Sequence, residues 1–281
     1  MEFKPPPLDY EYAITRIVQF IRDYFSRSGA RLAVIGLSGG IDSSVTLVLT
    51  VKALGRDRVK ALVMPDSSVT PREDVEDAIE LAEMLGVQYY VIDIKPIVES
   101  YATIVPFFDW GHRIATGNLR ARIRMNLLYY YANRFKGLVV GTGDKSELLL
   151  GYFTRYGDGG ADILPIGDVY KTQVREMGRR LGVPERIVRK PSSPRLWPGH
   201  LAEEELGLKY DVIDAVLYRY VDLGMSISEI VEDTGLSEEV VRAIIKRVHA
   251  YEYKRKMPPI PRVSKWSLYH DWRNPIEHSY P

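Results

Sequence analysis

Apolar residues along this chain follow two alternating patterns, one with helical spacing and one in short uninterrupted runs. Between residues 8 and 28 they recur at helical spacing and stop at Gly29, which indicates a helix with a glycine end. Residues 32–37 are then almost all apolar, as in a strand that helices cover on both faces. The chain is therefore predicted to open with a helix and a buried strand.

The same cycle of strand and helix repeats further along the chain. We predict strands over 59–64, 87–94 and 137–142, helices over 45–54, 73–85 and 118–135, and a loop over 66–71. Short helices are predicted over 210–221, 226–234 and 238–251. Alternating strands and helices favour a parallel sheet flanked by helices. The predicted fold class is α/β, with C-terminal helices added to that sheet.

Two segments fit neither pattern. Residues 151–165, GYFTRYGDGGADILP, are rich in glycine but also aromatic and charged, which is typical of a binding loop rather than a flexible linker. Residues 190–207 contain three prolines and two glycines, so we expect them to lack regular structure. This second segment is the best candidate for a mobile lid over a site.

Composition adds limits to this picture. The chain has 281 residues, 46% of them hydrophobic, which is enough to bury a core. We predict one domain over 1–281, with a core over about 11–259 and a tail over 260–281. There is no cysteine, so a disulfide, a thiolate metal site and a cysteine nucleophile are excluded.

Net charge and hydropathy limit which partners and which cellular location we expect. The 38 Lys and Arg residues balance 37 Asp and Glu residues, so a net charge of +1 predicts neither a nucleic-acid nor a membrane partner. Three consecutive prolines at 5–7 stand where a signal peptide would be apolar, and no later apolar run approaches membrane length. We therefore expect a cytoplasmic protein.

The segment SGGIDSS, Ser38 to Ser44, lies where a predicted strand ends and a helix begins. Its two glycines let the backbone approach a ligand, and the N–H groups and dipole of a helix N-terminus favour an anion. It is neither a Walker A loop nor the dinucleotide-binding GxGxxG pattern. The alternative is a tight turn in which Asp42 and Ser43 cap the helix. A phosphate site is favoured because a cap needs only one such residue.

This segment resembles the PP-loop of the N-type ATP pyrophosphatases, which split ATP between its α and β phosphates. Four further segments narrow the resemblance: MPDSSVTPREDVEDAIELAEMLGV (64–87), NLRARIRM (118–125), GTGDKSELLLGYFTRYGDGGADILP (141–165) and GDVYKTQV (167–174). Together they resemble the ammonia-dependent NAD synthetases over about residues 11–259. The resemblance implies a Rossmann-like fold of the adenine nucleotide alpha hydrolase type.

The resemblance also implies a reaction. Such a ligase forms a C–N bond by amidating nicotinic acid adenine dinucleotide (deamido-NAD) with ammonia at the expense of ATP. A carboxylate is a poor electrophile, so it is first adenylylated, and ammonia then attacks the acyl-adenylate. AMP and pyrophosphate are released. Mg²⁺ is the implied cofactor, because two anionic substrates must be brought together.

Site residues follow from the same resemblance. Asp42 and Lys171 are the implied catalytic residues, and Asp42 and Glu147 the implied Mg²⁺ ligands. The implied ATP site consists of Gly36, Leu37, Ser38, Gly39, Gly40, Ile41, Asp42, Ser43, Thr142, Lys171 and Ser193. The implied deamido-NAD site consists of Arg122, Arg155, Asp162, Tyr253 and Lys254.

Each of these residues also has a simpler interpretation. Glu147 could merely favour the dipole of a helix, and Lys171 could be a surface residue after a helix start at Asp168. Asp158 and Asp162 could be turn residues, although apolar neighbours place Asp162 near the core.

Three arginines of the NLRARIRM segment raise a question of orientation. Arg120, Arg122 and Arg124 recur at every second position and cannot share one helical face. At least one is expected to point inward, and we predict that it is Arg122.

The chain departs from the family pattern at several positions. His200, Leu201 and Ala202 stand where many members carry Gln-Thr-Asp. Arg155 replaces a usual lysine and Tyr253 a usual histidine. Ser192 could take the role given to Ser193. The tail carries Trp266, Tyr269, His270, Trp272, His278 and Tyr280, and could dock on its own protein or contact a second copy.

Two rival functions remain for comparison. Another PP-loop adenylating enzyme, acting on a nucleobase or tRNA, would need a basic surface that the net charge does not indicate. A non-catalytic adenine-nucleotide sensor would be expected to lack metal ligands, whereas Asp42 and Glu147 are present. Without a cysteine to hydrolyse glutamine, the nitrogen source is expected to be ammonia. The resemblance further implies a homodimer whose interface contributes to the dinucleotide site.

Overall fold

A computed structural model describes residues 3–266 of the chain. Its strands are β1 (Leu32–Gly36), β2 (Val59–Val63), β3 (Gln88–Val91) and β4 (Gly137–Val139). They form one parallel sheet in the order β3-β2-β1-β4, with Ala33 of β1 opposite Val59 and Leu138. The predicted parallel α/β sheet is confirmed, although β3 and β4 are shorter than expected.

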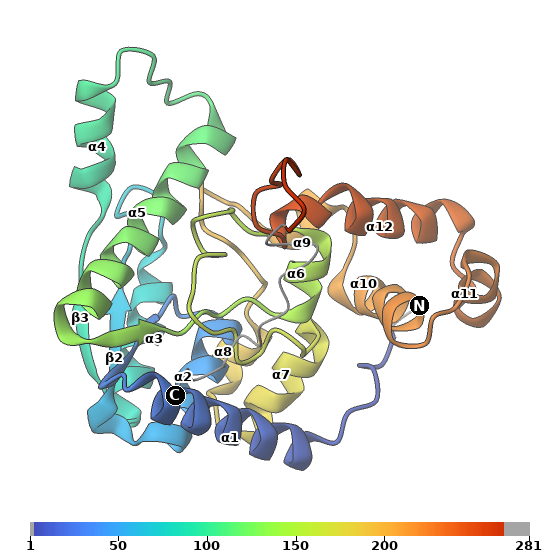
Figure 1. The fold of residues 1–281 in the computed structure, drawn as a ribbon, viewed down its shortest axis with the longest axis horizontal. Coiled ribbons are helices and arrows are strands. Elements are labelled where there is room, and N and C mark those ends of the chain that lie inside the picture. The colour runs from blue at the N-terminus through green and yellow to red at the C-terminus, as the bar shows by residue number, and fades with distance from the viewer. Residues whose placement is uncertain (1–2, 267–281) are drawn as a thin grey trace.

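Helices cover both faces of this sheet (Figure 1). One face packs against α1 (Tyr10–Ser28), α2 (Ile41–Leu54), α3 (Arg72–Met84), α7 (Lys171–Arg180) and α8 (Glu185–Arg189). The other packs against α4 (Lys95–Ile104) and α5 (Arg113–Phe135). Along β1, Ala33 and Ile35 pack into the core on the α1 and α2 face of the sheet, and Val34 packs into the core on the α4 and α5 face. The lack of apolar alternation in this strand therefore reflects burial on both sides.

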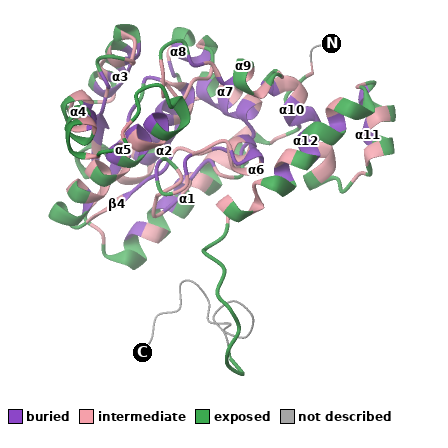
Figure 2. Ribbon diagram, turned by 90° about the horizontal axis from the view of Figure 1, so that it is seen from above, coloured by how far each residue is buried: buried purple, intermediate pink, exposed green. Residues whose placement is uncertain are grey.

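A second group of helices has its own apolar core beside the sheet. It consists of α10 (Tyr210–Leu217), which continues as a π-helical turn (Tyr218–Asp222), α11 (Ile227–Thr234) and α12 (Glu238–Ala250). These C-terminal helices pack on the short α6 (Lys145–Leu150) through residues such as Leu150 and Ile213. Figures 1 and 2 both place them at the opposite end of the molecule from α4.

Most predicted helix boundaries are confirmed by their caps. Asp9 accepts a hydrogen bond from the Tyr12 backbone N–H at 3.0 Å at the start of α1, and Gly29 ends the helix with φ of 66°. Ser226 and Glu229 form a capping box at the start of α11. Sequence signals at helix ends were therefore reliable where a capping residue was present.

Several helical features differ from expectation, among them the start of α5, which lies at Arg113 rather than at 118. α2 begins at Ile41, inside the SGGIDSS segment, and α4 and α8 were not predicted. α9 (Ala202–Leu206) lies within the segment expected to lack regular structure, so that expectation is wrong there. Three glutamates in the first turn of α9 favour its dipole, and Gly207 ends the helix with φ of 71°. Short helices of this kind show too little apolar periodicity to be recognised.

Two short 3₁₀ turns complete the described chain, at Arg56–Arg58 and Glu252–Lys254. Among residues 3–266, no helix combines the length and the apolar character needed to cross a bilayer.

Candidate active site

A cavity of about 560 Å³ opens where the strands end. The ends of β1, β2 and β4 contribute Leu37, Met64 and Thr142 to its wall. The other walls come from α5, from the 151–165 loop, from the 190–207 segment and from residues 251–254. A cavity at the carboxyl ends of parallel strands is the usual ligand site of this fold class.

The SGGIDSS segment forms one wall of the cavity. Gly40 is the N-cap of α2, and no side chain there accepts a hydrogen bond from the first turn. The Ser43 hydroxyl donates to the Gly40 carbonyl at 3.1 Å and lies 3.0 Å from the Ser38 hydroxyl. Asp42 and Ser43 therefore do not cap the helix, and its first N–H groups remain available to an anion.

Gly39 is required by a close backbone approach rather than by the cavity. Its φ is 75°, and a Cβ atom built there would lie 2.0 Å from the Asp74 carbonyl oxygen. Any other residue would push α3 away from the loop. Gly39 is the one residue of the 36–43 stretch that does not line the cavity.

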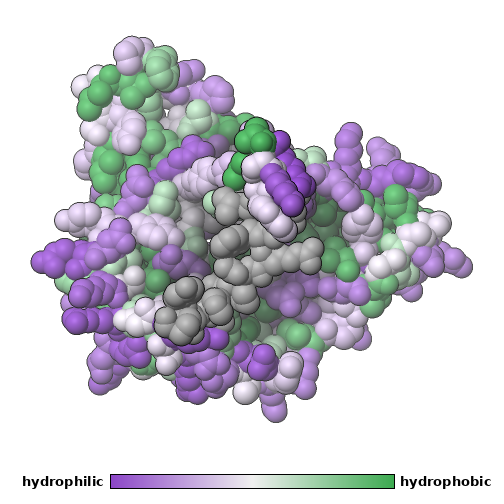
Figure 3. Space-filling view, in the orientation of Figure 1, coloured by the Kyte–Doolittle hydropathy of each residue, from purple (hydrophilic) through white to green (hydrophobic). Residues whose placement is uncertain are grey.

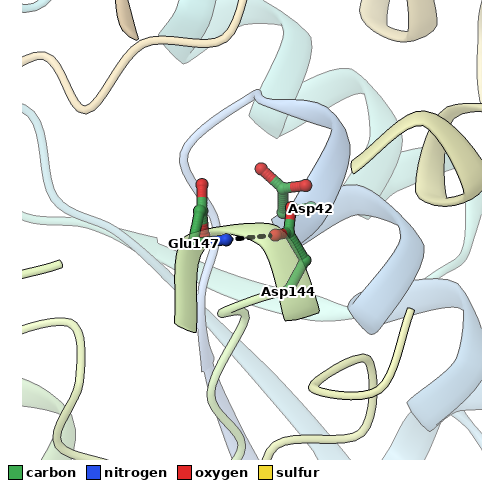
Figure 4. Close-up of side chains that lie close together, drawn as sticks. All are labelled: Asp42, Asp144 and Glu147. Atoms are coloured by element: carbon green, nitrogen blue, oxygen red, sulfur yellow. Dashed lines mark hydrogen bonds between the residues drawn. The ribbon is translucent and has the colours of Figure 1, made fainter. Parts of the chain in front are cut away.

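Three carboxylates gather beside this loop, from two different helices (Figure 4). Asp42 lies in the first turn of α2, Asp144 is the N-cap of α6, and Glu147 follows in the first turn of α6. Asp144 accepts a hydrogen bond from the Glu147 backbone N–H at 2.8 Å. The three groups can place one oxygen each within 4.8 Å of one another, which is close enough to share a cation.

Lys171, the first residue of α7, lies fully buried among these carboxylates. Its Nζ is 2.6 Å from Asp42 Oδ2, 2.8 Å from Asp144 Oδ2 and 2.8 Å from Glu147 Oε1. Lys171 and Asp144 lie beneath the cavity, whereas Asp42 and Glu147 line it. The simpler interpretation of Lys171 as a surface residue is wrong, because the start of α7 faces the start of α6.

The electrostatics of this carboxylate cluster favour a further cation. Burial raises the pKa of Glu147 to about 7, and the charge of Asp42 adds to that effect while Lys171 opposes it. Burial also raises the pKa of Asp144 well above its ordinary value. Burial alone would lower the pKa of Lys171, but the three carboxylates outweigh it and hold the pKa well above its usual value. The cluster thus retains protons that a bound cation would displace.

Asp144 was missed by sequence reasoning, although a signal for it existed. It precedes a helical run by one position and stands three residues before Glu147, the spacing of an N-cap and an N3 acid. That pattern would have placed both carboxylates on one turn of α6.

A second set of charged groups, on the other side of the loop, was also missed. Asp74 of α3 is buried and pairs with Lys190 at 2.8 Å and with Arg195 at 2.6 Å. Lys190 also pairs with Asp77 and donates to the Gly39 carbonyl at 3.0 Å. These contacts hold the 190–207 segment against α3 and the SGGIDSS loop.

The arginines of α5 are arranged differently from the prediction. Arg120 is buried and donates to Asp66 at 2.5 Å, and Arg124 lines the cavity and donates to the Met64 carbonyl at 2.9 Å. Arg122 is exposed, so the expectation that it points inward is wrong. Arg120 and Arg124 are four residues apart and share the inner face of α5, which leaves Arg122 on the outer face.

The other residues expected to contact deamido-NAD divide into two groups. Tyr253 and Lys254 line the cavity, and the Lys254 ammonium donates to the Gly151 and Phe153 carbonyls at 2.7 Å each. Arg155 lies outside, where it donates to the Lys256 carbonyl at 2.7 Å. Asp162 lies below the cavity wall and accepts from the Val139 N–H at 2.7 Å. Substrate contact by these residues stays a prediction.

Thr142 and Ser193, expected to contact ATP, both line the cavity. The Ser193 hydroxyl donates to the His200 carbonyl, and Ser192 accepts a hydrogen bond from Arg175 at 3.2 Å. His200 stacks on Trp197 and pairs with Glu205 at 2.7 Å, so the altered 200–202 stretch is well packed. The tail residues from Tyr269 onward lie outside the described residues.

The sheet order, the SGGIDSS loop at the end of β1 and the adjoining carboxylates define a PP-loop nucleotide-binding protein of Rossmann-like fold. A family model described as NAD synthase matches residues 13–258. The chain belongs to the NAD synthase family of amide-forming ligases.

Individual relatives agree with this assignment. The NH(3)-dependent NAD(+) synthetase of Hyperthermus butylicus is 58% identical over 254 residues, which cover 90% of this chain and 91% of that protein. The enzyme of the same name from Staphylothermus marinus is 55% identical over 254 residues, covering 90% and 92%. The solved structure of NMN synthetase from Francisella tularensis is similar with a TM-score of 0.79 and 34% identity, covering 91% of this chain and 99% of that one.

Proposed function

We propose that this chain amidates deamido-NAD to NAD with ammonia, consuming ATP and releasing AMP and pyrophosphate through an acyl-adenylate. The observation that carries the proposal is the carboxylate cluster with its buried Lys171 beside an uncapped helix N-terminus. The relatives named NH(3)-dependent NAD(+) synthetase support ammonia as the nitrogen source, as does the absence of cysteine from the chain.

The chain's own residues would divide the work as follows. The first N–H groups of α2, with Ser38 and Ser43, would bind the pyrophosphate portion of ATP. Lys171 would stabilise negative charge as pyrophosphate leaves, because three carboxylates, two of which line the cavity, hold its ammonium just beneath the cavity. Thr142 and Ser193 line the same cavity and would contact ATP.

The same cluster fits Mg²⁺. The Asp42 Oδ1 atom is buried and has no hydrogen-bond partner among the described residues. Carboxylate oxygens are the ligands that Mg²⁺ prefers, and this unpartnered atom belongs to a residue that lines the cavity. Asp42 and Glu147 would hold the ion, with Asp144 behind them. When bound, Mg²⁺ would neutralise the phosphates and lower the barrier to pyrophosphate departure.

We include a homodimer in the proposal. Apolar side chains gather in the open at the end of α4 and the start of α5: Ile104, Phe107, Trp110 and Ile114 are each more than half exposed. Figure 3 shows this apolar patch at the upper left. Exposed patches of this kind are typical of protein contacts. A second copy near the outer face of α5 would also bring Arg122 and Arg155 close to a bound substrate. A sedimentation measurement that finds only monomer at the concentration of the assay would exclude the homodimer.

Location is the remaining part of the proposal. We expect the enzyme in the cytoplasm, where ATP is available. Fractionation of the native cells is the direct test.

An assay with purified protein tests the reaction. ATP, Mg²⁺ and deamido-NAD are supplied with either ammonium or glutamine, and NAD and AMP are followed together. NAD and AMP are expected in equal amounts with ammonium and not with glutamine. ATP binding without AMP under either nitrogen source would instead favour a non-catalytic nucleotide sensor.

A parallel reaction addresses the acid substrate. The structural relative is titled an NMN synthetase, so the acid form of that mononucleotide is supplied in place of deamido-NAD. We expect the dinucleotide to give the higher kcat/KM. A higher value for the mononucleotide would overturn the choice of substrate but not the amidation itself.

A further inference from the structure

The C-terminal helices contribute a buried carboxylate to the back of the active site. Asp214 of α10 is fully buried and lies neither in the SGGIDSS loop nor in the carboxylate cluster. Its Oδ1 accepts a hydrogen bond from the Ser146 hydroxyl at 2.5 Å. Its Oδ2 accepts two hydrogen bonds from Thr172, from the backbone N–H at 2.8 Å and from the hydroxyl at 2.7 Å.

These bonds join the two helix starts that carry the catalytic groups. Ser146 stands between Asp144 and Glu147 on α6, and its hydroxyl also accepts the Lys171 backbone N–H at 2.9 Å. Thr172 is the residue after Lys171 on α7. One carboxylate thus satisfies free N–H and O–H groups at the N-termini of both α6 and α7, where negative charge is favoured.

Tyr210 approaches Lys171 from the same helix. It precedes Asp214 by four residues and so lies on the same face of α10. Its ring centroid is 5.3 Å from Lys171 Nζ, a cation–π distance, and the residue is almost fully buried. Tyr210 contacts the ammonium of Lys171, and Asp214 accepts the backbone N–H of the next residue, Thr172. Helix α10 therefore supports Lys171 at its side chain and at its backbone.

Burial and hydrogen bonding act in opposite directions on the Asp214 carboxyl. Burial raises the pKa of this carboxyl to about 6, although the hydrogen bonds from Ser146 and Thr172 and the charge of Lys171 oppose the shift. A carboxylate that is kept charged at neutral pH despite burial is held by its donors, so removing it leaves those donors unsatisfied.

We propose that Asp214 and Tyr210 are positioning residues that fix Lys171 against the carboxylates for the adenylylation step. This inference rests on the proposed function. A buried lysine has a long flexible side chain, and small errors in the placement of a charge-stabilising group lower the rate strongly. The C-terminal helices are then part of the catalytic apparatus rather than a separate packing unit.

The first experiment compares Asp214→Asn with a matched control, Asp211→Asn. Both remove one charge from α10, but Asp211 accepts the backbone N–H groups of Phe3 and Val212 rather than those of α7. For Asp214→Asn we expect kcat to fall roughly tenfold or more, with KM values changed less than about threefold. For Asp211→Asn we expect kcat within about twofold of wild type.

A double-mutant cycle separates positioning from general stability. If Asp214 acts through Lys171, then Asp214→Asn adds no further loss in a Lys171→Met background. If it acts only by stabilising the fold, the two losses multiply and the inference is overturned. Wild-type kcat in Asp214→Asn would also overturn it, whereas a wild type that forms neither NAD nor AMP would refute the proposed function itself.

Milder variants keep the test valid if Asp214→Asn does not fold. Thr172→Val and Ser146→Ala each remove hydrogen bonds to this carboxylate without removing it, and each should lower kcat in the same non-additive way with Lys171→Met. Tyr210→Phe keeps the ring and should retain activity, while Tyr210→Leu removes it and should lower kcat. Equal activity in the Phe and Leu variants would exclude a role for the ring.

Discussion

Two charged clusters flank the SGGIDSS loop, and they are built for different purposes. The carboxylate cluster sets three acids, Asp42, Asp144 and Glu147, against the single ammonium of Lys171. The cluster at the base of the 190–207 segment sets three acids, Asp74, Asp77 and Glu80, against three cations, Lys190, Arg195 and Arg186. The first has an excess of negative charge and a buried oxygen without a hydrogen-bond partner among the described residues, whereas the charges of the second balance.

This difference separates two roles for charged clusters around one cavity: an unbalanced cluster can bind a charged ligand, and a balanced cluster stabilises the fold. Buried charges that are not balanced within the protein are costly, so their persistence indicates that a ligand completes them. Balanced pairs mainly fix geometry. A triphosphate bound at the loop would lie between a site for its metal ion and a balanced cluster of ion pairs that fixes the loop.

The largest effect is expected in the carboxylate cluster. Glu147→Gln removes one of the negative charges and a ligand proposed for Mg²⁺, so NAD formation at saturating substrate should fall about 100-fold or more. The control is Glu73→Gln, an exposed acid in the first turn of α3. Steady-state rates at fixed Mg²⁺ measure the effect, and a loss under about threefold would remove the distinction between the two clusters.

A smaller and different effect is expected on the other side of the loop. Asp74→Asn leaves Lys190 and Arg195 without their shared partner and loosens the contact of the 190–207 segment with Gly39. We expect KM for ATP to rise roughly tenfold while kcat changes less than about threefold. Initial rates over a range of ATP concentrations give both constants. A fall in kcat at unchanged KM would place Asp74 with the carboxylate cluster instead.

Proton displacement sharpens the comparison further. The pKa of Glu147 is raised by burial to about 7, so the stability that this group contributes is present at acid pH and is lost as pH rises through about 7. Mg²⁺ needs the ionised form, so its affinity should fall by up to about tenfold per pH unit below pH 7. Melting temperatures with and without Mg²⁺ at pH 6 and 8 measure this, and we expect the larger rise at pH 8.

Glu147→Gln is the control for that dependence. Without an ionisable group at this position, the difference between the Mg²⁺-induced rises at pH 6 and pH 8 should shrink. An unchanged difference would assign the titration to Asp144, whose pKa is also raised by burial.

The parts that sequence reasoning recovered are those whose signals are local. The SGGIDSS loop, its strand and its helix are contiguous, and the helix ends at Gly29 and Ser226 carry their own capping residues. The fold class followed from the same local pattern repeated along the chain. Asp42, Glu147 and Lys171, which the family motif assigned to one site, lie together in the structure, while their roles stay a prediction.

The parts that it missed depend on contacts between distant segments. Asp74 and Lys190 are separated by 116 positions, and Ser146 and Asp214 by 68, so no periodicity links them. Arg122 was misplaced because spacing shows which arginines share a face but not which face is buried. Two of the three arginines were therefore inside, and the motif pointed to the third.

The smallest expected effect concerns Arg186, at the rim of the ion-pair cluster around Asp74 and Asp77. It donates to Asp77 at 2.6 Å and also pairs with Glu80, but it is about half exposed, and Lys190 remains as a second partner for Asp77. Arg186→Gln should lower the free energy of unfolding by at most about 1 kcal/mol, because solvent screens an exposed ion pair. Denaturant unfolding measures it, with kcat unchanged. Arg72→Gln breaks the more exposed pair with Glu76 and should lower the free energy of unfolding by still less. If Arg72→Gln lowers it by more than Arg186→Gln does, exposure does not set the strength of these pairs.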